Sequence, residues 1–148
     1  MTKRRSAVVA GMLAAAALTL SACEKPAPAV TVWSGSSSDR AEARCWSSDA
    51  SQTVNLSSCV AGGTGVPTLS VLPGQTIGIS VDTVVAQDGW YPTIGNQRLT
   101  AQPLTTTYYR FALSESDLAQ PLQLRVLSLG QGGQQLRGVW LFELTRRS

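Results

Sequence analysis

The chain contains no histidine, and this limits the chemistry that its side chains can perform. Ser-His-Asp and Cys-His nucleophilic sites need an imidazole as the base, and copper sites of the cupredoxin type need imidazole ligands. A catalytic Ser-Lys dyad is also disfavoured, because Lys25 is the single lysine beyond residue 22 and arginine is not a base at ordinary pH. We therefore expect a protein that is not an enzyme and that holds no metal and no cofactor.

Carboxylate pairs are the remaining candidates for acid and base catalysis. Asp82 with Asp88, or Glu115 with Asp117, supplies two carboxyl groups of the kind that hydrolyse glycosides. Turn and cap positions are the favoured interpretation for all four, since aspartate is common there. Residues 62–65, Gly-Gly-Thr-Gly, lack the Lys-Ser/Thr ending of a phosphate-binding loop and are predicted to be a flexible loop.

Cys23 ends a pattern that directs export and lipid attachment. Basic residues at positions 3–5 precede an apolar run from Ala7 to Leu20, which is about 14 residues long and too short to span a bilayer. Leu20-Ser21-Ala22-Cys23 resembles the lipobox of bacterial lipoproteins. Residues 1–22 are therefore predicted to be a lipoprotein signal peptide. Cys23 is predicted to carry a diacylglyceryl group on the outer face of the cytoplasmic membrane.

Cleavage before Cys23 changes the charge balance. The formal charge of +3 arises from Lys3, Arg4 and Arg5, and their loss leaves nine basic and nine acidic residues. A neutral domain lacks the clustered lysine and arginine that bind nucleic acid, so no nucleic-acid partner is expected. Arg4-Arg5 leaves twin-arginine export open, although general secretion is favoured.

Cys45 and Cys59 form an even pair once Cys23 is assigned to lipid. Disulfides persist in exported proteins, and a bond between these two would close a loop of about 15 residues, worth roughly 3 kcal/mol. Free thiols or half of a metal site are the alternatives. They are disfavoured because a thiolate metal site needs more ligands.

Aromatic residues give the one positive indication of recognition. Trp90-Tyr91 follows a turn at Asp88-Gly89, and such a pair can form an apolar platform for sugar rings or an anchor in a protein groove. Adjacent residues of a strand point to opposite faces, so at least one of the two belongs to the core. Trp90 and Tyr91 are the candidate binding platform, with core packing favoured for Trp90.

Apolar residues in this sequence recur mainly at every second position, so we expect β-strands to position the candidate residues. Residues 76–82 alternate without error, and four more apolar runs show the same period: Val30–Val32, Leu69–Val71, Tyr109–Leu113 and Leu122–Val126. After Val126 the phase slips to Leu127 and Leu129, as a β-bulge would cause. Val139–Phe142 is apolar on both faces and indicates a central strand.

The predicted fold class is all-β, an antiparallel β-sandwich with an immunoglobulin-like arrangement as the first choice. Cys45 and Cys59 are too close in sequence for the usual bridge between the sheets of such a domain. Helical signal is thin and limited to Asp39–Arg44 and to a capping pattern at Ser114–Asp117. The expected organisation is a lipidated, proline-containing tether over residues 23–29 and a single domain over residues 30–148.

Five features together are similar to an uncharacterised family of actinobacterial lipoproteins, a domain of unknown function. They are the lipobox with Cys23–Pro26, the pair Cys45 and Cys59, and the segments Val81–Trp90, Gly95–Thr100 and Gly138–Phe142. The resemblance covers nearly the whole chain after residue 22. It implies an exported lipoprotein and supplies no catalytic residue, ligand or partner.

The sequence thus predicts a membrane-anchored lipoprotein whose non-catalytic domain serves as an envelope interaction or accessory module, with a protein or a glycan as its partner. Two alternatives stay open: a structural lipoprotein without a discrete ligand, and a carboxylate-based hydrolase of cell-wall material. The sequence does not predict an oligomeric state.

Overall fold

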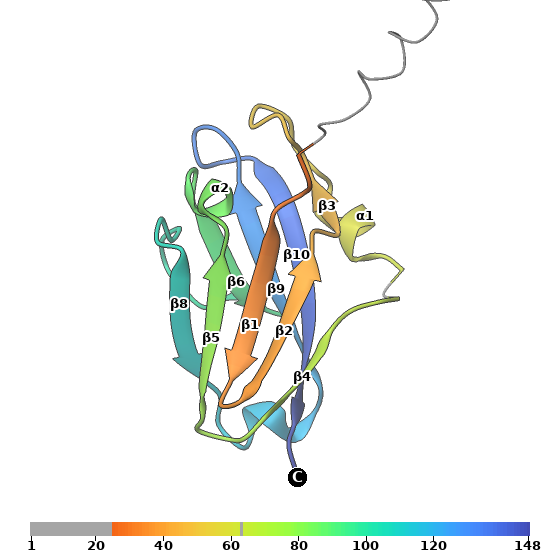
Figure 1. Cartoon of the computed structure of the whole chain (residues 1–148), viewed down its shortest axis with the longest axis vertical. Coiled ribbons are helices and arrows are strands. Elements are labelled where there is room, and N and C mark those ends of the chain that lie inside the picture. Colours follow the sequence, from red (N-terminus) through yellow and green to blue (C-terminus); the bar gives the residue numbers. More distant parts are fainter. Residues whose placement is uncertain (1–24, 63) are drawn as a thin grey trace, which may run out of the picture.

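The computed structural model describes residues 25–62 and 64–148, which form a sandwich of two β-sheets (Figure 1). Cys23 and the predicted signal peptide lie outside the described residues. Within the described part of the chain, no helix is long and apolar enough to cross a membrane. The predicted all-β, antiparallel sandwich is confirmed, since strands make up most of the regular structure.

The first sheet has four antiparallel strands in the order β2-β1-β5-β8, and Figure 1 looks onto its outer face. The strands are β1 (Ala29–Ser34), β2 (Ser37–Glu42), β5 (Thr76–Val81) and β8 (Tyr108–Ala112). Val30, Val32, Ile77 and Ile79 are fully buried, as the alternation predicts.

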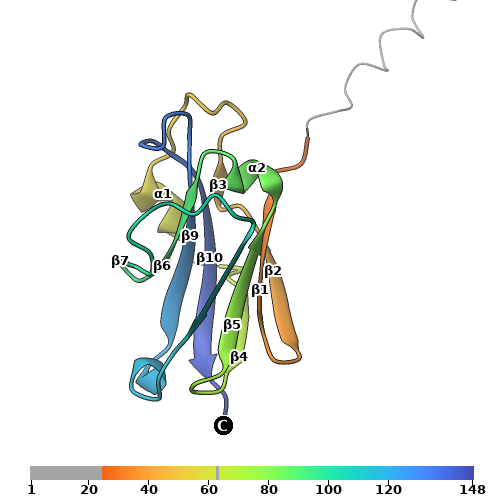
Figure 2. The same ribbon diagram turned by 90° about the vertical axis from the view of Figure 1, so that its left-hand side faces the viewer.

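The second sheet has the order β3-β10-β9-β6-β7, and β4 pairs in parallel with the end of β10. Its strands are β3 (Cys45–Trp46), β4 (Thr68–Val71), β6 (Trp90–Ile94), β7 (Gln97–Arg98), β9 (Leu122–Leu129) and β10 (Leu136–Arg146). Figure 2 shows the two sheets as facing layers, and the apolar side chains between them form the main core.

An immunoglobulin-like topology stays a prediction. The chain passes from one sheet to the other after β2, β4, β5, β7 and β8, and β6 begins with the fully buried Trp90. Greek-key sandwiches share both features. The disulfide differs, because it joins β3 to α1 (Leu56–Val60) instead of linking the two sheets.

Strand β10 is buried on both faces, as its apolar run predicts. Trp140, Phe142 and Leu144 point into the main core, whereas Val139 and Leu141 contact a second apolar cluster. That cluster is supplied by the segment between β3 and β4, which packs α1 against the outside of β9 and β10 (Figure 2). We call this segment the outer layer.

The predicted bulge after Val126 is wrong in position. Strand β9 pairs without interruption there, and its phase changes because Leu127 contacts the outer layer while Val126 contacts the main core. The irregularity lies instead in β10. Arg137 is the extra residue between the pairs Leu136–Leu129 and Gly138–Ser128.

Short helical signals prove unreliable. The helix predicted for Asp39–Arg44 is wrong, because β2 pairs with β1 along its whole length and this ladder overrides a weak local preference. The capping pattern at Ser114 is confirmed at the start of the 3-10 turn η1 (Asp117–Ala119). Helix α2 (Thr83–Ala86) was not predicted.

The folded domain begins at Pro28, slightly before the predicted boundary at residue 30. Pro28 and Ala29 are both buried. The carbonyl of Pro28 accepts a hydrogen bond from Nε1 of Trp140 at 3.0 Å, and the backbone N–H of Ala29 donates to Asp82 at 3.0 Å. Pro28 and Ala29 are therefore fastened to the core at one end of the sandwich.

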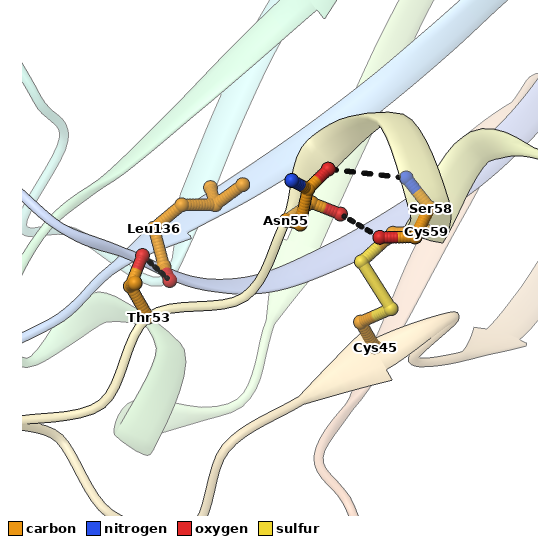
Figure 3. Close-up of a disulfide and its surroundings, with 6 residues drawn as sticks. All are labelled: Cys45, Thr53, Asn55, Ser58, Cys59 and Leu136. Carbon is orange, nitrogen blue, oxygen red and sulfur yellow. Dashed lines mark hydrogen bonds between the residues drawn. A yellow bond between two sulfur atoms is a disulfide. The ribbon is translucent and has the colours of Figure 1, made fainter.

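Cys45 and Cys59 form the predicted disulfide, which ties the outer layer to β3 (Figure 3). Their α-carbons are 5.5 Å apart, a usual separation for such a bond. Asn55 caps α1 by accepting from the backbone N–H of Ser58 at 3.2 Å, and the Thr53 hydroxyl donates to the Leu136 carbonyl at 3.1 Å. These contacts hold the outer layer over β10.

Replacing both cysteines, Cys45→Ala with Cys59→Ala, should lower the free energy of unfolding by about 2–4 kcal/mol and leave the sandwich intact. The bond closes a loop outside the main core, so strand pairing does not depend on it. Thermal unfolding followed by circular dichroism measures the effect, with Ser57→Ala on the exposed side of α1 as the control. Equal melting temperatures for the oxidised and reduced wild-type protein would contradict a structural role for the bond.

Candidate functional site

Trp90 belongs to the core, as the favoured interpretation of this residue predicts, so its ring is not part of an open platform with Tyr91. Its side chain is fully buried in the main core between the sheets, and Nε1 donates to the Thr106 carbonyl at 2.8 Å. Trp90 points inward together with Pro92 and Ile94 of β6, and these two pair with Val126 and Leu124 of β9, which are buried in the main core.

Tyr91 points to the opposite face of β6 and is also covered. Only 8% of its surface is exposed, and the guanidinium of Arg98 lies 4.0 Å from the centre of its ring. A cation over an aromatic face is favourable, and the low exposure of Tyr91 leaves little ring surface for a ligand. Neither residue of the pair offers an open platform.

An accessible aromatic surface lies on the outer face of the first sheet instead. Trp33 of β1 and Tyr108 of β8 have ring planes within 12° of parallel and centroids 6.4 Å apart. The guanidinium of Arg110 lies 5.6 Å from the centre of the Tyr108 ring. Tyr108 is 38% exposed and Trp33 is partly buried. We call Trp33, Tyr108 and Arg110 the aromatic face.

Gly78 of β5 allows Trp33 to lie flat on the sheet. Strand β5 runs between β1 and β8, and Gly78 pairs with Trp33 on one side and with Arg110 on the other. A Cβ at this position would collide with Cε2, Cζ2 and Nε1 of the Trp33 indole. The indole therefore covers the glycine, a known way to compensate for a missing side chain in a strand, and turns its other side outward.

The surroundings of the aromatic face are polar, and the nearest exposed carboxylate on β2, Glu42, lies in the row beyond Arg40. The strand registers place two rows of side chains across this face: Arg40, Thr31, Ser80 and Tyr108 in one, and Ser38, Trp33, Gly78 and Arg110 in the next. These rows hold two arginines and no carboxylate. Within residues 25–62 and 64–148, neither Arg40 nor Arg110 forms a salt bridge.

Sequence reasoning missed this site, although part of the signal was present. The alternation of Val30 and Val32 places Trp33 on the outward face of its strand, and the alternation of Tyr109 and Phe111 does the same for Tyr108. The alternation within a single strand does not show which strands pair, so it cannot predict that β1 and β8 both lie beside β5. Only that pairing brings the two aromatic residues together.

The four carboxylates considered for catalysis have separate partners in the fold. Asp88 pairs with Arg137 at 3.5 Å and Glu115 with Arg146 at 2.7 Å, while Asp82 accepts from the Ala29 N–H. Asp117 accepts from the hydroxyl of Ser114 at 2.6 Å and from its backbone N–H at 2.8 Å, and these bonds lower the pKa of Asp117 below its ordinary value. The turn and cap interpretation accounts for the contacts of Asp117, whereas Asp88 and Glu115 form ion pairs and Asp82 makes no side-chain cap bond to α2.

The glycine-rich loop accepts hydrogen bonds from an arginine side chain of the same domain. The guanidinium of Arg44 donates to the carbonyls of Gly62 and Thr64, at 2.6 and 2.9 Å. The loop thus directs carbonyl oxygens at Arg44, whereas a phosphate needs N–H donors. In the described part of the chain, no group of three or more histidine, cysteine, aspartate or glutamate side chains could hold a metal ion.

A hollow of about 870 Å³ lies where the chain enters the domain. Residues 25–29 line it together with Trp46, Asp82 and Arg137. Arg137 is 6% exposed, stacks 4.3 Å from the Trp46 ring, and donates to the carbonyls of Ser47 and Ser48. Asp82 is bound to the Ala29 N–H, and Arg137 to Asp88 and to two backbone carbonyls, so we assign no catalytic or binding role to the hollow.

Comparison of the chain with family models, with curated proteins and with solved structures found no match.

Two single substitutions separate the core tryptophan from the aromatic face. Trp90→Ala should lower the free energy of unfolding by about 3–5 kcal/mol, because it removes a fully buried ring. Tyr108→Ala should change it by no more than about 1 kcal/mol, because the ring is on the surface. Urea unfolding measures both, and comparable losses from the two variants would show that the aromatic face is part of the structural core.

Proposed function

We propose that this protein is an exported lipoprotein, anchored through Cys23, whose β-sandwich is a non-catalytic interaction module of the cell envelope. The observation that carries the proposal is the aromatic face, because Trp33 and Tyr108 present ring surfaces on an outer sheet face beside the Arg110 guanidinium. Tryptophan, tyrosine and arginine are the residues that most often dominate binding energy at recognition surfaces.

The position of the chain entry supports anchoring at one end of the domain. Lys25, the first described residue, is two positions after Cys23, and the chain joins the core at Pro28. The C-terminus lies at the opposite end of the sandwich (Figure 1). A lipid on Cys23 would hold the entry end near the membrane and leave the strands and the aromatic face extending away from it.

The disulfide supports export. Disulfide-bonded cysteines are common in exported domains and rare in the reducing cytosol of ordinary bacteria. Cys45 and Cys59 are bonded to each other, which leaves Cys23 for lipid attachment. This division of the three cysteines agrees with the predicted signal peptide and with the resemblance to actinobacterial lipoproteins.

The contacts of the carboxylates support a binding role over hydrolysis. Asp88 and Glu115 are each paired with an arginine, and Asp82 holds the backbone of Ala29. A glycoside hydrolase needs two carboxyl groups that face the same bond. Because these three carboxylates of the described part of the chain already have partners in the fold, we prefer the interaction module to the hydrolase.

Cys23→Ala should abolish membrane anchoring in the native host. The unmodified chain should then appear uncleaved or be released from the membrane, because anchoring rests on the acyl chains. Detergent phase separation and the intact mass of the protein measure this, with Cys45→Ala as the control that keeps Cys23. An unmodified Cys23 on mature wild-type protein would contradict the anchor.

Photo-cross-linking in intact cells tests the interaction module. A benzophenone amino acid in place of Tyr108 should form adducts with an envelope component, whereas the same probe in place of Leu72 should form few. Leu72 is the matched control, because it is 41% exposed and lies at the turn between β4 and β5, away from the aromatic face. Equal adduct yields at the two positions, or none at either, would contradict a recognition role for this face.

A further inference from the structure

We propose that the aromatic face binds a uronic-acid glycan, whose pyranose rings stack on Trp33 and Tyr108 and whose carboxylate is bound by Arg110. This inference rests on the proposed interaction function and names the chemistry of its partner. It follows from the shape, the charge and the extent of the surface.

The shape of the surface suits a sugar ring. The Trp33 indole lies across Gly78, and the Tyr108 ring is within 12° of parallel to it, so the two rings present nearly parallel planes. The face of a pyranose carries axial C–H groups, which are attracted by the negative face of an aromatic ring. Thr31, Ser38 and Ser80 lie in the same two rows and supply hydroxyl groups for the polar edge of a sugar.

The charge of the surface selects an acidic sugar. The Arg110 guanidinium lies over the Tyr108 ring, 5.6 Å from its centre, and no carboxylate shares the two rows. Arginine binds a carboxylate through two parallel hydrogen bonds. In a uronic acid the carboxylate is attached directly to the pyranose ring, so a ring stacked on Tyr108 brings its carboxylate to Arg110.

A second cation lies at the other edge of the sheet. Arg40 of β2 is in the same row as Tyr108, and three strand spacings place their α-carbons about 14 Å apart. An oligosaccharide that crosses the strands from Tyr108 would extend toward this second guanidinium. The face thus offers guanidinium groups at both of its edges, with Glu42 next to Arg40 on the exposed side of β2.

The extent of the surface favours a glycan over a protein. Among the described residues, Tyr108 and Leu72 are the large apolar side chains that are exposed, and Leu72 lies elsewhere. A stable protein interface buries about 800 Å² on each partner around an apolar centre. One exposed tyrosine and one partly buried tryptophan do not supply such a centre, whereas they suffice for stacking sugar rings.

Binding of matched oligosaccharides to the full chain, purified as the cell makes it, tests this assignment. Isothermal titration calorimetry with oligogalacturonate should show binding, and its methyl ester, which has the same rings without the charge, should bind at least about tenfold more weakly. Polyglutamate, which has carboxylates without sugar rings, should not bind measurably.

Two pairs of variants assign the binding to residues. Arg110→Gln should weaken oligogalacturonate at least about tenfold and leave the methyl ester unchanged. Arg98→Gln is the matched control, because it removes the guanidinium that covers Tyr91 on the other sheet. Tyr108→Ala should weaken both sugars, while Leu72→Ala should weaken neither.

Three outcomes would overturn the inference. Equal affinity for the acid and its methyl ester, polyglutamate binding as tight as oligogalacturonate, or no binding of any probe would each remove the uronic-acid assignment. The interaction module itself fails only if the probe at position 108 also forms no selective adducts in cells. Adducts at that position to a protein, without binding of the oligosaccharides, would likewise reject the glycan and keep the module.

Discussion

The burial of β10 on both faces is the constraint on which the rest of this structure depends. The strand pairs with β9 along one side and with β3 and β4 along the other. Its inward residues, Trp140 and Phe142, occupy the middle of the sandwich, and its outward residues, Val139 and Leu141, require an apolar cover. The outer layer supplies that cover, and the disulfide holds it in place. A strand of this kind cannot lie at an edge, so its position organises the second sheet.

Much of this arrangement could be predicted from the sequence, because it depends on local pattern. The period of two identified the inward faces of β1 and β5, and the doubly apolar run identified β10 as central. The parity of the cysteines and the export pattern led to the Cys45–Cys59 bond. The sequence also partly predicted that the Trp90 side chain points into the core, since adjacent residues on a strand face opposite sides of the sheet.

The remaining features depend on contacts between distant parts of the chain. Leu127 breaks the alternation of β9 because the outer layer covers it, and the sequence around Leu127 does not predict this contact. The sequence of Asp39–Arg44 is compatible with a short helix, but in the fold this segment pairs with β1 as a strand. The aromatic face required the order β1-β5-β8, which joins three strands from separate regions of the sequence. These differences show how strand pairing overrides local preference.

The central claim is that recognition takes place on the outer face of the first sheet, at Trp33, and not at Trp90 or in the hollow beside Trp46. The chain has four tryptophans, so their indole N–H resonances report on each of these places separately. Titration of the isotope-labelled protein with the carbohydrate fraction of the cell envelope is the most direct test. We predict that the Trp33 resonance shifts, while those of Trp90 and Trp140 stay fixed, because their N–H groups are bonded to the carbonyls of Thr106 and Pro28. A shift confined to Trp46 would contradict recognition on this face, and no shift at all would contradict a glycan as its partner.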